Sequence, residues 1–209
     1  MSAGPGAQPA GAWEPAPGPV DDSVSAFTAQ VAQASRDRAG SWDAVAEVLT
    51  MDEEAVARLR AGDQAALWRA GARWLGDDAQ IFVGDLLNLD VYARGAERRG
   101  LDADVAALAR DHATLVAPDA AVVEHVRRVA DLCREEADAW ARGDLAGGKA
   151  LRAREREVID AHLVPVLPAL GGRLAQGAEA KISRTLGRLV LAVLSVESGK
   201  DYQRAVLGE

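Results

Sequence analysis

The chain has 209 residues, a formal net charge of -8 at pH 7 and one cysteine. That length fits a single domain. The negative charge argues against general nucleic-acid binding, which needs Lys and Arg to neutralise phosphates, and against an anionic membrane surface. One cysteine excludes an intrachain disulfide and suggests a reducing compartment. No apolar run is long enough to cross a bilayer and no secretory signal opens the chain, so we expect a cytoplasmic protein without membrane insertion.

The first segment, residues 1–19, holds five of the eight prolines and four glycines, with Trp13 as its only large side chain. Such a composition buries too little apolar surface to offset the entropy lost on ordering. We therefore predict a disordered tail over residues 1–20. Residues 21–209 are rich in Ala and Leu, and no segment alternates polar and apolar residues as a strand does. They are predicted to form one globular all-α domain of about eight to ten helices.

In chain order, a first helix carrying Phe27, Val31 and Ala34 is expected from Ser23 or Ser25, and a second over 42–49. Thr50 and Glu53 have the spacing of a capping box, which predicts that Thr50 begins a third helix. Further helices are expected to end near residues 62, 76 and 100. A helix opening at Asp102 would place these four side chains on one face: Val105, Leu108, His112 and Leu115.

The clearest helical pattern follows Pro118, which suits the first turn of a helix. Its apolar residues recur at intervals of three and four: Val122, Val126, Val129, Cys133, Ala137 and Trp140. This helix is predicted to end at Gly143, and Asp144 to cap its successor. Pro165 and Pro168 should interrupt that successor, residues 171–172 (Gly-Gly) should form a flexible point, and a last helix should run over 179–196.

No catalytic or metal-binding motif stands out. The three histidines, His112, His125 and His162, have no paired spacing that a zinc site would use. Cys133 lies on the apolar stripe and is expected to be a buried, inert thiol. The arginines at 152, 154 and 156 are expected to spread over a solvated face, and we identify no pair of carboxylates placed for acid–base work. The sequence therefore predicts no enzyme activity, no metal and no cofactor.

Two strings in the C-terminal half resemble the TorD/DmsD family of redox-enzyme maturation chaperones. These are AWARGDL at 139–145 and REREVIDAHLVPVLPAL at 154–170. The family has a helix that ends in an Ala-x-Gly-Asp turn, and a following helix that closes in His-Leu-x-Pro-x-Leu-Pro. Five residues match the second motif position by position: His162, Leu163, Pro165, Leu167 and Pro168. Further upstream the resemblance is weaker, and only Asp111 and Leu115 match the family's Asp-Tyr-x-Arg-Leu-Phe segment. Overall, the resemblance covers most of residues 36–196.

This resemblance implies a TorD-like helical fold and a chaperone function. Such a protein binds the twin-arginine signal peptide, or the apo form, of a partner oxidoreductase until the molybdopterin cofactor of that partner is inserted. The family's Glu-Pro-x-Asp-His signature, associated with leader recognition, is reduced here to APDAA at 117–121. The resemblance then places the peptide-binding site at Pro118 and Asp119, with Leu115 and Val122 as its apolar floor. A leader has a cationic end and an apolar middle, which an acidic rim and an apolar floor would complement.

Two alternatives stay open. The chain is either a divergent family member that serves as a structural or assembly partner without binding leaders, or a helical enzyme or ligand-binding protein whose site forms only in three dimensions. Co-purification with an oxidoreductase would favour the chaperone. A deep polar pocket with clustered carboxylates or histidines would favour the third interpretation.

Overall fold

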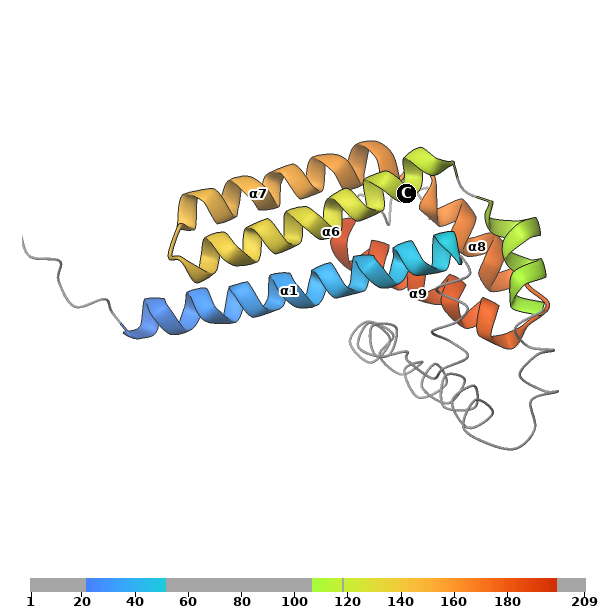
Figure 1. Ribbon diagram of the computed structural model, residues 1–209, viewed down its shortest axis with the longest axis horizontal. Helices are drawn as coiled ribbons and strands as arrows, with labels where there is room; N and C mark the ends of the chain where they lie inside the picture. Colours follow the sequence, from blue (N-terminus) through green and yellow to red (C-terminus); the bar gives the residue numbers. More distant parts are fainter. Residues whose placement is uncertain (1–21, 52–106, 118, 199–209) are drawn as a thin grey trace, which may run out of the picture.

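The computed structural model describes residues 22–51, 107–117 and 119–198, and all the regular structure in these ranges is helical (Figure 1). The predicted all-α class is confirmed for this part of the chain. The predicted tail over 1–20, Pro118 and the helices expected between 52 and 106 lie outside the described residues, so the total number of helices and the TorD-like topology stay predictions.

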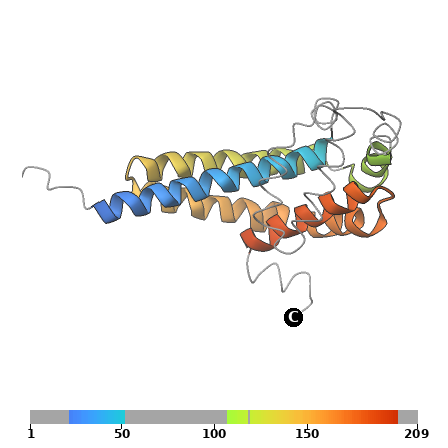
Figure 2. The same ribbon diagram turned by 90° about the horizontal axis from the view of Figure 1, so that it is seen from below.

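Three long helices lie side by side and form the main body. They are α1 (Asp22–Thr50), α6 (Ala120–Ala141) and α7 (Leu145–Val158), with α6 packed between the other two (Figure 1). A second group, α8 (Leu167–Gly177) and α9 (Lys181–Ser198), packs pairwise and extends beyond one end of this layer, as the view from below shows (Figure 2). The apolar core is built mainly from buried side chains of α1, α6, α8 and α9.

The first two predicted helices are one continuous helix, α1, so the predicted break before residue 42 is wrong. Ser35, Gly40 and Ser41 have weak helix propensity, but Ala39 and Trp42 bury themselves in the core on either side of them. Burial of an amphipathic face outweighs local propensity in a helix of this length. Phe27 of the same helix is 55% exposed, and its ring lies perpendicular to the Trp140 ring with centroids 6.2 Å apart.

Thr50 does not begin a helix within the described residues, contrary to the capping-box prediction. It is the last residue of α1, and its hydroxyl donates to the carbonyl oxygens of Ala46 and Glu47 one turn earlier. The next residue, Met51, has a φ of 37°, which takes the chain out of the helical conformation. Glu53, the other half of the expected box, lies outside the described residues.

The helix predicted from the stripe at 122–140 is confirmed as α6, and all six stripe residues are buried. It ends as expected at Gly143, whose φ of 76° suits a residue without a Cβ. The Asp144 carboxylate then caps α7 by accepting from the N–H of Gly147. Gly148 lets α7 approach α6 closely, because a Cβ there would lie 2.7 Å from the Trp140 ring.

The predicted interruption at Pro165 and Pro168 is confirmed. After α7 the chain forms a π-helical turn, η3 (Ile159–Leu163), and α8 begins at Leu167. The helical segments Leu145–Leu163 and Leu167–Gly177 meet at 61°, with Pro165 between them and Pro168 in the first turn of α8. In the described part of the chain no single helix has the length and apolar character of a membrane span, although this bent pair has them when its two arms are taken together.

The residues at 171–172 do not form the flexible point that the sequence suggested. Both glycines lie inside α8, and Gly171 faces Gly187 of α9 where the two helices cross. A Cβ on Gly187 would lie 2.5 Å from the backbone nitrogen of Ala175, so the crossing requires a glycine there. What reads in the sequence as flexibility is close packing between two helices.

A short helical segment, Ala107–Asp111, continues into the π-helical turn η2 (His112–Val116) and ties α9 to α1. Asp111 is buried and accepts hydrogen bonds from the N–H groups of Glu179 and Ala180 at the start of α9. Burial disfavours the carboxylate, but these N–H groups and the Ser183 hydroxyl outweigh it and lower the pKa of Asp111. His112 Nε2 donates to the Leu49 carbonyl at 2.6 Å, which fixes the segment to the end of α1.

Candidate functional site

The structure places three of the four predicted peptide-binding residues. Asp119 is exposed, Leu115 is half-buried against the core, and Val122 is 8% exposed and belongs to the core. Pro118 lies outside the described residues. Leu115 could therefore contact a bound peptide, whereas the Val122 side chain is almost fully buried.

Asp119 is the N-cap of α6, one residue before the first helical turn. Its Oδ1 accepts from the N–H of Ala121 at 3.1 Å, which satisfies one of the free donors at the helix start. The other carboxylate oxygen, Oδ2, has no hydrogen-bond partner in the described part of the chain. Asp119 thus stabilises the helix and still has an oxygen available to a cation.

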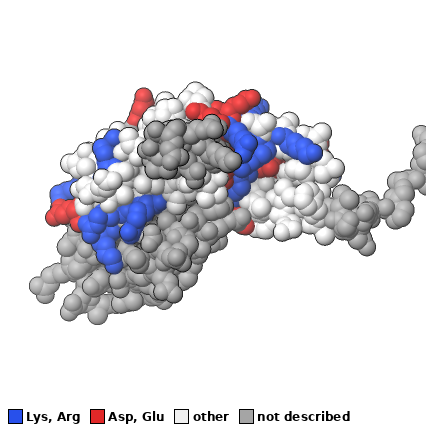
Figure 3. Space-filling model, turned by 180° about the vertical axis from the view of Figure 1, so that it is seen from behind, with Lys and Arg blue, Asp and Glu red and all other residues white. Residues whose placement is uncertain are grey.

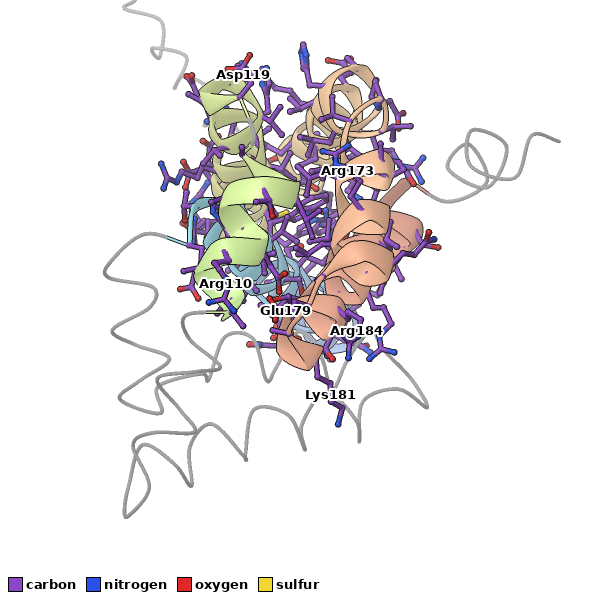
Figure 4. The ribbon with its side chains drawn as sticks, turned by 90° about the vertical axis from the view of Figure 1, so that its right-hand side faces the viewer. Arg110, Asp119, Arg173, Glu179, Lys181 and Arg184 are labelled. Carbon is purple, nitrogen blue, oxygen red and sulfur yellow. The ribbon has the colours of Figure 1, made fainter. Side chains whose placement is uncertain are left out.

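A cation already lies beside the predicted floor. Arg173 of α8 donates from Nε to the carbonyl oxygen of Leu115 at 3.1 Å, and the Leu115 side chain lies over Gly177 of the same helix. In the end-on view, Arg173 lies on the same side of the molecule as Asp119 (Figure 4). The surroundings of the predicted site are thus mixed in charge and not purely acidic.

The most strongly built polar site lies inside the bundle and was not predicted. Arg38 of α1 donates to three carboxylates from three other helices: Nη1 to Glu136 of α6 and Nε to Glu197 of α9, both at 2.7 Å, and Nη2 to Glu155 of α7. These four side chains are 10% exposed or less. We call this set, together with Arg152, the ionic cluster.

Arg152 closes the ionic cluster on its solvent side. Its Nη1 donates to Glu155 Oε2 at 2.8 Å and to Glu197 Oε2 at 2.9 Å, while its side chain is 32% exposed. Trp140 donates from Nε1 to Glu136 Oε1 at 3.1 Å and completes the shell on the α6 side. The expectation that Arg152 belongs to a solvated face is therefore wrong, because this arginine faces the interior.

Charge balance in the ionic cluster depends on one proton. Burial raises the pKa of Glu155 to about 8; Arg38 opposes the rise, and the neighbouring Glu136 and Glu197 add to it. Near neutral pH, Glu155 is then mostly protonated and adds little negative charge beside Arg38 and Arg152, and burial also raises the pKa of Glu197. Glu155 Oε1 is buried without a hydrogen-bond partner, whereas Oε2 accepts from both arginines.

The sequence identified no pair of carboxylates placed for acid–base work, and the ionic cluster shows carboxylates whose environments nevertheless differ. Glu136 and Glu155 share a site, and the pKa of one of them is strongly displaced. A buried network of this kind fixes how helices pair more than it adds stability, because desolvation offsets most of the attraction between the charges. We interpret it as structural.

Cys133 lies next to the ionic cluster, and the prediction of a buried thiol is confirmed, since it has no exposed surface. Burial raises the pKa of Cys133 well above its ordinary value, and the nearby Arg38 only partly opposes this effect. A thiol that stays protonated is a poor nucleophile.

His125 of α6 and His162 of η3 stack with ring centroids 3.9 Å apart and planes within 5° of parallel. Sequence spacing could not indicate that these two histidines are in contact, because they are 37 positions apart. No group of three or more His, Cys, Asp or Glu side chains that would hold a metal ion occurs among the described residues. His162, which carries part of the family resemblance, is exposed and packs on α6 through this stack.

A hollow of about 400 Å³ lies on the surface between α1 and α6. It is lined by Arg36, Ala39, Gly40, Asp43, Arg134 and Asp138. Arg134 is engaged with Asp43 and Asp131 along one wall. Two carboxylates, Asp43 and Asp138, line the hollow together with the two arginines, and no histidine lines it.

No protein-family model, curated protein or solved structure matches this chain.

Proposed function

We propose that the protein is a helical chaperone, resembling the TorD/DmsD family, that binds the twin-arginine leader or the apo form of a molybdenum-cofactor oxidoreductase in the cytoplasm before export. The observation that carries the proposal is the matched segment at 154–170. In the structure this segment forms the last part of α7, the η3 turn and the start of α8, with Leu163 and Leu167 buried on either side of the bend.

The proposed contact with the leader is Asp119. An exposed ion pair contributes only about 0.2–1 kcal/mol, but one that becomes partly buried on binding costs about 2–5 kcal/mol when a partner is removed. Asp119 Oδ2 has no other partner in the described part of the chain, and Leu115 offers the apolar contact beside it. We therefore assign the cationic end of the leader to Asp119 and its apolar middle to Leu115.

Asp119→Asn tests this assignment. Asn caps a helix about as well as Asp, so the free energy of unfolding should change by less than about 1 kcal/mol. Affinity for a twin-arginine leader peptide, measured by calorimetric titration, should fall at least several-fold. Asp138→Asn is the matched control, since Asp138 is an exposed carboxylate at the far end of the same helix. Equal affinities of both variants and the wild type would remove Asp119 from the site.

The second candidate is a divergent member of the family that acts as a structural or assembly partner without binding leaders. The specific observation in its favour is Arg173, which places a guanidinium on the Leu115 carbonyl and would repel a leader arginine. Absence of binding by the wild-type protein, with any twin-arginine leader, would favour this candidate.

A further inference from the structure

The hollow between α1 and α6 is bordered by two opposite charges that do not pair with each other. We call it the α1–α6 hollow, and it is lined by Arg36, Ala39, Gly40, Asp43, Arg134 and Asp138. The two helices run side by side in opposite directions, as the colours of Figure 1 show. Asp43 of α1 pairs with Arg134 of α6 at one end of the hollow. Asp138 lies four residues further along α6, about 6 Å from Arg134, and Arg36 faces the same space from α1.

Small residues of α1 keep the α1–α6 hollow open. A Cβ on Gly40 would meet nothing within 4 Å. Ala39, which is 3% exposed, adds only a methyl group to the lining. The resulting space of about 400 Å³ lies at the lower end of the range of about 300–1,000 Å³ that small-ligand sites occupy. The hollow therefore has room for a molecule about the size of an amino acid.

The side chains of Arg36 and Asp138 are exposed and available to a ligand. In the described part of the chain, neither side chain forms an ion pair or a hydrogen bond. Opposite charges elsewhere on the surface do meet: Arg128 and Glu135 of α6 pair at 3.1 Å, and basic side chains lie beside acidic ones at several places on the face seen from behind (Figure 3). The hollow thus keeps one guanidinium and one carboxylate apart on facing helices.

We propose that the α1–α6 hollow binds a free α-amino acid, with the ligand's carboxylate on Arg36 and its ammonium group on Asp138. A guanidinium donates two parallel N–H groups to a carboxylate, and a carboxylate accepts from an ammonium group. Asp138 would repel a ligand with only a negative charge, and Arg36 would repel one with only a positive charge. Recognition therefore requires both charges on one small molecule.

This site is distinct from the proposed leader site. Asp138 follows Asp119 by 19 residues, which corresponds to about 28 Å along α6. The inference therefore does not depend on the proposed function, and failure of leader binding would leave it unchanged.

The test titrates the full chain separately with L-alanine, L-leucine, L-glutamate and L-lysine, and follows the backbone amide signals by heteronuclear NMR. At least one of these amino acids should bind saturably and shift the signals of residues around Gly40. Two isosteric analogues of that amino acid separate its charges. The α-hydroxy acid lacks the ammonium group and the amino-acid amide lacks the carboxylate, and each should bind at least about fivefold more weakly.

Variants of the hollow test the assigned contacts. Arg36→Gln should weaken binding of the amino acid at least about fivefold and leave binding of its amide unchanged, because the amide has no carboxylate for Arg36. Gly40→Leu should abolish binding by filling the hollow, and leucine suits a helix interior better than glycine. The matched control is Arg127→Gln, which removes an exposed arginine of α6 outside the hollow and should change affinity less than about twofold.

Three results would overturn the inference. They are no saturable binding of any of the four amino acids, equal affinity for the amino acid and its two analogues, and equal losses in Arg36→Gln and Arg127→Gln. If Gly40→Leu fails to fold, Arg36→Gln still decides the assignment, because its side chain is exposed and forms no ion pair with another described residue.

Discussion

Cys133 illustrates how far a single side chain is set by its position on a helix. It occupies the middle of the α6 stripe, has no exposed surface and has a pKa raised by burial. We predict that a bulky thiol reagent modifies the native protein roughly a hundredfold or more slowly than the urea-unfolded chain, because labelling must wait for an opening of the core. Similar rates for native and unfolded protein, followed by mass spectrometry, would show that the thiol is accessible.

Glu155 makes the stability of the protein depend on pH. Its pKa of about 8 in the folded protein lies above the ordinary value of 4.5, so the folded state holds a proton that the unfolded chain releases. The stabilisation from this proton is fully present below about pH 4.5 and is lost as pH rises through 8. Between these values, ionisation of the unfolded chain progressively favours unfolding.

Glu155→Gln should therefore remove this dependence, because an amide resembles the protonated carboxyl in shape and does not titrate. We expect the variant and the wild type to have similar free energies of unfolding at pH 5. At pH 9 the variant should be more stable by about 1 kcal/mol or more, since one pKa unit corresponds to about 1.4 kcal/mol. Urea denaturation from pH 5 to 9 measures this difference, and Glu157→Gln, at an exposed position of α7, controls for the lost charge. A difference that does not grow with pH would contradict a protonated Glu155.

At the scale of elements, the crossing of α8 and α9 depends on glycines. Gly187→Ala would put a methyl group 2.5 Å from the backbone nitrogen of Ala175, and a backbone contact cannot yield as a flexible side chain does. We predict a loss of about 1–3 kcal/mol in the free energy of unfolding. Gly172→Ala is the matched control, because its Cβ would meet nothing within 4 Å and alanine favours the helix by about 0.5–1 kcal/mol. Equal stabilities of the two variants in urea denaturation would mean that the helices do not cross so closely.

The same glycines mark a limit of sequence interpretation. Periodicity, caps and prolines located α6, α7 and the bend before α8, since each of these signals is local. A Gly-Gly pair has no such single meaning, because glycine serves flexible turns and tight helix crossings equally well. Gly171 could be assigned to the second role only once α9 was seen beside it. The continuity of α1 was missed for a related reason, because it depends on burial against α6.

At the scale of the whole molecule, the ionic cluster joins helices that are distant in sequence. Arg38 and Glu197 are separated by 159 positions, so no spacing rule could have paired them. A partial signal existed, since Glu136 follows Cys133 by three residues and precedes Trp140 by four, on the face that carries the apolar stripe. A charged residue within such a stripe indicates a buried partner but cannot identify it.

The proposed leader-binding site rests on family resemblance, and the structure adds the geometry around its described residues. Asp119 caps α6 and keeps one oxygen free of described partners, while Arg173 lies against Leu115. Binding at this end of the molecule should depend on the charge of the ligand, because Asp119 attracts a cation and Arg173 repels it.

The most direct test of leader binding is a calorimetric titration of the wild-type protein with two peptides. One is the leader of a molybdenum-cofactor oxidoreductase, and the other is the same leader with both arginines replaced by glutamine. The proposed function predicts saturable binding of one leader per protein chain, weakened at least about tenfold by the replacement. No binding of the twin-arginine leader, or equal affinity for the two peptides, would contradict leader recognition by this protein.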